Sequence, residues 1–287
     1  MMKLFRAYIE LTKPRILTMV LIMTALGYVL GGMGIHSPSG LIFVLLGAGM
    51  TCGGAAVLNH FIERDVDRKM NRTRNRPLPS GLIPANRAFL FGVYLVLFGV
   101  MLLTWKVNLV TAFLALLTAF LYAVVYTPMK RLTWLNTFVG AIPGALPPMG
   151  GWAAATGRVE AGAWALFAIL FIWQIPHFYA IAWIHKEDYA RGGFKMLPSL
   201  DPTGIRTMTQ SLIFATALIP VSLLPAWLGI SSWVYGVGAF ILGLGMLWSC
   251  VYFAQSRSVT GARRVLRASI IYLPLLFILI LIDFGLR

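Results

Sequence analysis

The sequence predicts an all-α, polytopic membrane protein with about nine transmembrane helices. Three observations support this fold class. Of the 287 residues, 59% are hydrophobic and only 11% are charged, and the mean hydropathy is +0.81. The apolar residues gather in runs of about 20, which is the length that crosses the hydrocarbon core of a bilayer. The basic residues fall between these runs, mostly on one side of the predicted membrane.

The remaining composition excludes other classes. The net charge of +15 does not indicate a nucleic-acid-binding protein, because a soluble protein of that class would not be this apolar. We attribute the positive charge to membrane topology and to contacts with phosphate groups or lipid. Cys52 and Cys250 both lie in apolar runs, so neither a disulfide nor a cysteine metal site is expected.

Each apolar run predicts one helix. The first ends in a Gly-rich stretch without a convincing cleavage site, so we expect a retained helix rather than a signal peptide. The second ends in a cluster of acidic and basic residues. The fifth contains the letters GAIPGALPPMGGW, which predict a kinked helix, and the sixth contains a proline followed by a histidine. The expected helices lie near 15–34, 41–62, 88–105, 108–127, 134–154, 161–184, 209–228, 232–254 and 267–284.

The basic residues support this number of helices. Of the 24 Lys and Arg residues, all but Lys106, Arg158 and Arg287 fall on one side of the predicted membrane. By the positive-inside rule the N-terminus is cytoplasmic and the C-terminus lies outside. Two long cytoplasmic loops, near 63–87 and 185–208, hold most of the acidic residues. We expect a single transmembrane domain over residues 1–287.

The first acidic motif lies at the end of the second predicted helix. Asn59, Glu63 and Asp67 are spaced i, i+4, i+8, so a helix that continues past the membrane places them on one face. One amide and two carboxylates form an oxygen-only site that suits Mg²⁺. The adjoining cations, from Arg64 to Arg76, are suited to phosphate oxygens. A salt-bridged patch at the membrane surface is the alternative interpretation.

The second acidic motif ends the sixth predicted helix. Glu187 and Asp188 place carboxylates at the same membrane face, where two acidic sites can hold a diphosphate through Mg²⁺. His177 follows Pro176 inside the helix and should face the bundle interior, as a substrate contact or as a hydrogen-bonded structural residue. His60 and His185 lie beside the two acidic motifs. For them both a helper role and a structural role are open.

Several stretches resemble a known family. Residues 59–67, NHFIERDVD, resemble the N-x-x-x-D/E-x-x-x-D motif of the UbiA superfamily of intramembrane prenyltransferases, and 72–81 resemble the loop that follows it. Three more stretches resemble the protohaem IX farnesyltransferase (haem O synthase) branch: LTKPRI at 11–16, YTPMKRLTWLNTFVGAIPGALPPMGGWAAATG at 126–157, and QIPHFYAIAW with DYARGGFKMLP within 174–198. Quinone-pathway members carry D-x-x-x-D at the second motif, whereas Ile184 stands four residues before Asp188. Glu187 is the expected substitute.

The resemblance implies a helix bundle around a cavity that opens toward the cytoplasm. Farnesyl diphosphate, haem B and water would react there to give haem O and diphosphate, with Mg²⁺ as cofactor. The catalytic candidates are Asn59, Glu63, Asp67 and Asp188, and Glu187 joins them as a metal ligand. The candidate diphosphate contacts are Arg72, Arg76, Lys130, Arg131 and Lys186, and His177 is the candidate haem contact.

The same resemblance implies a bacterial inner-membrane protein in contact with lipid. Its product would pass to a haem-modifying enzyme or a terminal oxidase. An aromatic prenyltransferase of a quinone pathway is the alternative within the enzyme class. A secondary transporter, with a substrate site at the helix breaks, is the alternative outside it, and a structural assembly factor would tolerate loss of the carboxylates.

Overall fold

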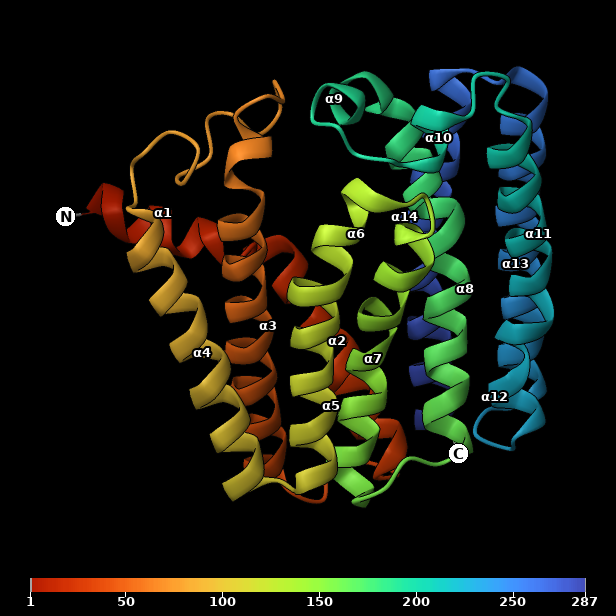
Figure 1. Cartoon of the computed structure of the whole chain (residues 1–287). Helices are drawn as coiled ribbons and strands as arrows, with labels where there is room; N and C mark the ends of the chain where they lie inside the picture. The colour runs from red at the N-terminus through yellow and green to blue at the C-terminus, as the bar shows by residue number, and fades with distance from the viewer. Residues whose placement is uncertain (1, 287) are drawn as a thin grey trace.

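The computed structural model describes residues 2–286, and every regular element in this part of the chain is a helix (Figure 1). The all-α fold is therefore confirmed. In chain order the elements are α1 (Met2–Leu11), α2 (Pro14–Gly31), α3 (Pro38–Asp67), α4 (Ala85–Lys106), α5 (Leu109–Phe120), η1 (Leu121–Tyr126), α6 (Thr127–Leu132), α7 (Asn136–Thr156), α8 (Ala161–Ile184), α9 (Lys186–Arg191), α10 (Leu197–Leu200), α11 (Ile205–Ser222), α12 (Leu224–Trp227), α13 (Trp233–Ser256) and α14 (Val259–Gly285).

Eight helical segments of the described chain are long and apolar enough to cross a membrane. They are Pro14–Gly31, Pro38–Asp67, Ala85–Lys106, Leu109–Leu132, Ala161–Ile184, Ile205–Trp227, Trp233–Ser256 and Val259–Gly285. The chain is therefore a multi-pass membrane protein. The remaining expected helix, 134–154, is α7, which is rich in Gly and contains three prolines and is not among these eight segments. It is continuous in the structure, and the kink expected there stays a prediction.

The helical conformation is interrupted between α1 and α2, around Lys13. The sequence predicted a helix only from residue 15, so the separate helix α1 was not expected. Lys13 has φ of 54° and ψ of 62°, which is the left-handed region that non-glycine residues rarely adopt. Pro14 follows it, and a proline disfavours the right-handed helical conformation in the residue before it. The proline itself suits the first turn of α2. The break turns the Lys13 side chain toward α3.

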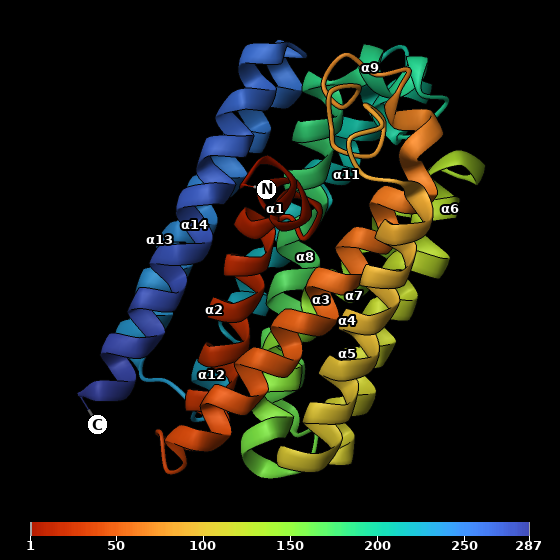
Figure 2. The same cartoon turned by 90° about the vertical axis from the view of Figure 1, so that its left-hand side faces the viewer.

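Both acid-bearing segments lie at the same end of the bundle (Figures 1 and 2). The loop expected over 185–208 contains the short helices α9 and α10. The connection from α3 to α4 runs beside α9, and α14 ends at the opposite end of the molecule (Figure 2). This arrangement concentrates most of the acidic residues, together with the adjoining arginines and lysines, at one end.

Small residues bring α2 and α7 into close contact. A Cβ atom added to Gly151 would lie 1.9 Å from the carbonyl oxygen of Thr24, and one added to Gly27 would lie 1.9 Å from that of Pro148. Within a bilayer, such backbone approach supplies the packing that holds helices together. The two glycines therefore set the spacing of α2 and α7, and α7 in turn packs against α8.

Candidate active site

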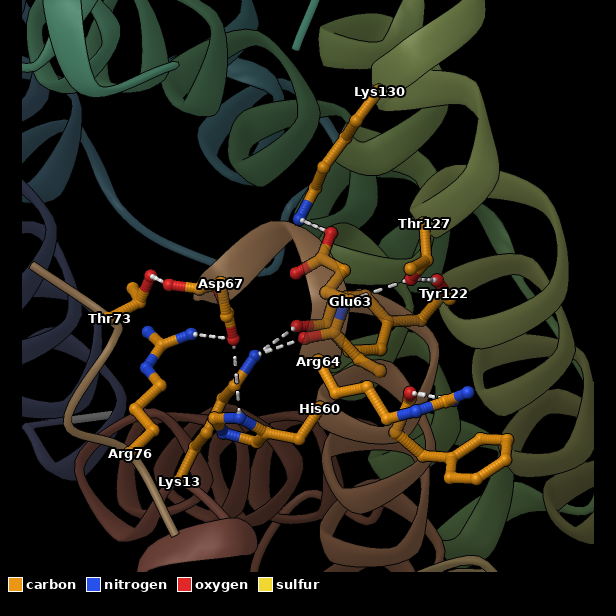
Figure 3. Close-up of polar contacts among 12 residues, drawn as sticks. Lys13, His60, Glu63, Arg64, Asp67, Thr73, Arg76, Tyr122, Thr127 and Lys130 are labelled. Carbon is orange, nitrogen blue, oxygen red and sulfur yellow. Dashed lines mark hydrogen bonds and ion pairs between the residues drawn. The ribbon is translucent and has the colours of Figure 1, made fainter. Parts of the chain in front are cut away.

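The first acidic motif lies on one buried face of α3. This helix has 30 residues and continues to Asp67, so the expected extension past the membrane segment is confirmed. The side chains of Asn59, Glu63 and Asp67 are all buried, with relative exposures of 0%, 6% and 1%. Buried charges need partners, because removing them from water is costly. The structure supplies a different cation for each of the three (Figure 3).

Lys13 reaches Asn59 from the break between α1 and α2. Its Nζ donates to Asn59 Oδ1 at 2.5 Å and to the Tyr122 hydroxyl at 3.0 Å. The left-handed backbone of Lys13 makes this reach possible, since a continuous helix would carry the side chain elsewhere. Strained backbone conformations of this kind concentrate at functional sites.

The two carboxylates contact cations from other segments. Lys130 Nζ, at the end of α6, donates to Glu63 Oε1 at 2.8 Å. Arg76 Nη1, in the loop after α3, donates to Asp67 Oδ2 at 2.9 Å. Two of the predicted diphosphate contacts therefore lie directly beside the predicted metal ligands.

A π-helix positions the groups that face Asn59. The element η1 lies between α5 and α6, and π-helical turns are rare and occur mostly at functional sites. Thr127 follows it at once and is fully buried, and its hydroxyl donates to the carbonyl oxygen of Tyr122 at 2.8 Å. The hydroxyl oxygen of Thr127 in turn accepts from Asn59 Nδ2 at 2.9 Å. The amide oxygen of Asn59 is thereby directed toward Lys13.

The second acidic motif lies close to the loop after α3. The backbone N–H of Asn71 donates to Asp188 Oδ1 at 3.3 Å, and Arg191 forms an ion pair with the same oxygen. The Arg191 hydrogen bond holds the pKa of Asp188 below its ordinary value. Burial, with the nearby charge of Arg72, lowers the pKa of His185. Glu187 is exposed, so its role as a substitute ligand stays a prediction.

The other predicted phosphate contacts surround the site without bonding to it. The guanidinium of Arg72 lies 5.8 Å from the centre of the Tyr189 ring, and Lys186 Nζ lies 5.1 Å from that of Trp183. Both cations are exposed, as is Arg131 beside Lys130. The structure does not bring these three cations together with Glu63 and Asp67, and their role as phosphate contacts stays a prediction.

His177 lies on α8, away from the acidic face. Its Nδ1 is 2.8 Å from the Ser269 hydroxyl of α14, and its ring stacks on that of Trp173 at a centroid distance of 4.8 Å. The Trp173 indole N–H donates to the Ser269 carbonyl oxygen at 3.0 Å. The histidine is therefore held by one nitrogen and by stacking, which leaves Nε2 as the nitrogen available to a substrate.

The oxygen donors on α3 fit a divalent cation. Among residues 2–286, no three or more His, Cys, Asp and Glu side chains gather closely enough to hold a metal ion by themselves. Zinc and other transition metals favour such clusters, whereas Mg²⁺ takes one or two carboxylates and completes its shell with water and substrate phosphate. Asn59, Glu63 and Asp67 already face positive charges here. They therefore suit a hard cation that shares its coordination with a substrate, and Asp188 joining them stays a prediction.

Two residues that contact Asn59, Lys13 and Thr127, were not predicted as site residues from the sequence. Lys13 lies within the LTKPRI stretch, and the only local signal was a lysine before a proline at the start of an apolar run. Thr127 gave no signal, because its contact with Asn59 depends on how α3 and α6 pack. His60, for which a helper role and a structural role were both open, stands i, i+3, i+7 with Glu63 and Asp67 on the same helical face.

Comparisons with known proteins show the family of this chain. The UbiA prenyltransferase family matches residues 20–280. The chain is 49% identical to a protohaem IX farnesyltransferase of Solibacter usitatus and 45% identical to one of Salinibacter ruber, covering 97% of this chain in both cases and 98% and 99% of the relatives.

Two solved structures share the fold. One, described as digeranylgeranylglyceryl phosphate synthase in membranes, has a TM-score of 0.84 at 17% identity and covers 99% of this chain and 100% of that one. The other, a UbiA homologue from Archaeoglobus fulgidus bound to DMAPP and Mg²⁺, has a TM-score of 0.62 at 15% identity, covering 96% and 99%. The chain therefore belongs to the UbiA prenyltransferase family and is a prenyltransferase.

Proposed function

We propose that this protein is a protohaem IX farnesyltransferase, which converts haem B, farnesyl diphosphate and water to haem O and diphosphate. The activity named for the two bacterial relatives, which align over nearly the whole chain, supports this function over the quinone-pathway and transporter alternatives. The observation that carries the proposal is the buried face of α3, where Asn59, Glu63 and Asp67 each meet a cation.

The chemistry at this face is departure of diphosphate from the farnesyl carbon. The allylic C–O bond breaks, and its electron pair goes to the diphosphate oxygen. Lys130, Arg76 and Lys13 lie where they can move from the protein oxygens to the phosphate oxygens as charge develops there. Arg72, Lys186 and Arg131 contact the diphosphate from the exposed edge of the site.

Mg²⁺ is the proposed cofactor, and Asn59, Glu63 and Asp67 would hold it, with Asp188 and Glu187 contributing from the second motif. When bound, it supplies positive charge that neutralises the leaving diphosphate. The UbiA homologue bound to DMAPP and Mg²⁺ supports this choice of cofactor.

The acceptor lies farther into the bundle. The farnesyl cation is attacked by the haem vinyl group, and water then adds to the resulting cation and releases a proton. The apolar interior limits access of bulk water to the first cation. His177, held at Nδ1 by Ser269 and stacked on Trp173, offers Nε2 to the haem.

The distribution of charge supports a topology for this enzyme. The end that carries the acidic motifs and most of the Lys and Arg residues faces the cytoplasm, and α14 ends outside. The protein acts as a single domain in a bacterial inner membrane, in contact with lipid. It supplies haem O to a downstream haem-modifying enzyme or terminal oxidase.

The test is a product assay with alternative acceptors. Membranes that contain the protein are incubated with labelled farnesyl diphosphate and Mg²⁺, together with haem B or with a hydroxybenzoate, and the products are identified by mass spectrometry. We expect haem O, and no product when the metal is chelated. Prenylation of the hydroxybenzoate alone, or recovery of unchanged substrates, would contradict the proposal.

A further inference from the structure

His60 is a buried histidine at the candidate active site whose ring nitrogens both lack a hydrogen-bond partner. Its relative exposure is 3%. Asp67 Oδ2 lies 4.0 Å from Nδ1, too far for a hydrogen bond, and already accepts from Arg76 at 2.9 Å. Among the described residues, neither nitrogen therefore has a partner at hydrogen-bonding distance, and the dashed line to the ring in Figure 3 is the 4.0 Å pair with Asp67.

A buried imidazole in this state lacks a hydrogen-bond acceptor for its N–H group. In every protonation state the ring carries at least one N–H donor. Leaving a buried donor unsatisfied costs free energy, and nearly all buried polar groups in native proteins have a partner. A group from outside the chain is therefore needed beside His60, and it must accept a hydrogen bond.

The surroundings indicate the charge of that group. Three cations, Lys13, Arg76 and Lys130, lie around the face of α3 that carries His60 (Figure 3). Each of these cations contacts one oxygen of α3, and His60 shares its helical face with Glu63 and Asp67. Three cations and a free N–H donor around one region favour an anion with several acceptor oxygens.

We propose that the ring N–H of His60 donates a hydrogen bond to a non-bridging oxygen of the substrate's diphosphate group. This assignment rests on the proposed function, and it extends that function by a contact that the charged residues do not make. The bond strengthens as the C–O bond of the allylic substrate breaks and negative charge builds on the diphosphate. His60 transfers no proton in this step, so it is a binding group rather than an acid.

Two other occupants of the space beside the His60 ring would give different results in the experiment below. A water molecule between His60 and Asp67 would satisfy the ring but would leave diphosphate binding indifferent to the donor. Direct coordination of the metal by His60 would make metal binding itself depend on the imidazole, even without an anion.

The experiment measures binding of inorganic pyrophosphate and Mg²⁺ to the purified full chain by calorimetry. His60→Met removes the N–H donor at similar volume, and His60→Gln keeps a donor. His36→Met is the matched control, because His36 is exposed in the loop between α2 and α3, at the end opposite α9 (Figures 1 and 2). The pyrophosphate titrations are made with Mg²⁺ present, and the Mg²⁺ titrations are made without pyrophosphate.

We expect His60→Met to weaken pyrophosphate binding about tenfold or more, because it removes a hydrogen bond to a charged group. His60→Gln keeps a donor, so its affinity for pyrophosphate should stay within about threefold of that of the unsubstituted protein. Mg²⁺ binding alone should be unchanged in both. Equal pyrophosphate binding by all variants would overturn the proposal, as would a loss of Mg²⁺ binding by His60→Met in the absence of pyrophosphate.

A second measurement avoids substitution. In the ¹⁵N-histidine-labelled protein, the His60 ring resonances should shift when pyrophosphate is added in the presence of Mg²⁺, and those of His36 should not. Unchanged His60 resonances at saturating pyrophosphate would also refute the contact. Failure of the unsubstituted protein to bind pyrophosphate at all would instead overturn the farnesyltransferase function on which the proposal rests.

Discussion

Asn59 Nδ2 donates to Thr127 Oγ1 at 2.9 Å, and this bond joins α3 to the first residue of α6. Thr127 directs its own hydroxyl hydrogen to the carbonyl oxygen of Tyr122, so its oxygen is left to accept. The amide of Asn59 is therefore fixed with its nitrogen toward Thr127 and its oxygen toward Lys13. An asparagine that could rotate freely would present the wrong atom to a cation.

Replacing Thr127 with Val tests this orientation. Valine keeps the shape of threonine but removes the acceptor, so the Asn59 amide loses its fixed direction. We expect Mg²⁺ affinity and haem O formation to fall about tenfold, as is usual when the partner of a metal ligand is removed. Thr127→Ser keeps the hydroxyl and should recover most of both. Equal Mg²⁺ affinity in the two variants would show that the hydroxyl does not position Asn59.

Asp67 and Asp65 form a matched pair for the carboxylate requirement. Asp67 is buried and bonded to Arg76, whereas Asp65 is exposed and pairs with Arg64 and Arg68. We expect Asp67→Asn to reduce haem O formation by at least about a hundredfold, and Asp65→Asn to leave it nearly unchanged. The haems extracted from membranes report the result. Similar losses in both variants would indicate a general effect of surface charge.

Lys130 and Glu63 should depend on one another for stability. Lys130→Met leaves a buried carboxylate without its cation, which typically destabilises a protein by about 3–5 kcal/mol. We expect a corresponding fall in the thermal unfolding temperature of the detergent-solubilised protein. Adding Glu63→Gln to this variant should restore most of the lost stability. Simple additivity of the two losses would show that the pair is not coupled.

Gly151 and Gly150 are neighbours in α7 with opposite surroundings. A Cβ at Gly151 meets the Thr24 carbonyl oxygen, whereas one at Gly150 has nothing within 4 Å. We expect Gly151→Ala to destabilise the protein by about 1–3 kcal/mol through overpacking. Gly150→Ala should be neutral or stabilising by up to about 1 kcal/mol, because Ala favours helix. Thermal unfolding of both variants checks the expected difference.

Asp188 should make the contact between α9 and the loop after α3 sensitive to acid. The pKa of Asp188 is lower in the folded protein than its ordinary value. The ionised carboxylate therefore stabilises the fold at pH values above that ordinary pKa. This contribution is lost as the pH falls through the folded pKa. Exchange of the Asn71 amide hydrogen, which bonds to Asp188, should accelerate there. Arg191→Gln should move this acceleration to higher pH, and an unchanged transition would exclude Arg191 as the cause.

The helical period explains why the acidic face was predictable. The positions of Asn59, Glu63 and Asp67 depend only on α3 continuing past its apolar segment, and that is a local property of the chain. Arg76 and Lys130 were also predicted as phosphate contacts. Their pairing with particular carboxylates was not, because it depends on where the loop and α6 return to α3.

The contacts that could not be predicted join distant segments. Lys13 meets Asn59 across 46 residues, through a left-handed backbone that a lysine rarely adopts. Thr127, which bonds to the same residue, directly follows a π-helix. Both contacts depend on backbone conformations that composition and periodicity do not record. The separate helix α1 escaped prediction for a related reason, since a short segment carries too little pattern to mark its ends.

The η1 segment also makes the number of residues between α5 and α6 important for function. A π-helical turn holds one residue more than an α-helical turn, and each residue of an α-helix advances the side chains by about 100°. Deleting a single residue within 121–126, so that this stretch relaxed to ordinary pitch, would swing Thr127 and Lys130 together away from α3. Thr127 and Lys130 would still be present, yet their contacts with Asn59 and Glu63 would be lost. Natural variation should therefore tolerate changes of identity in this stretch far better than changes in its count.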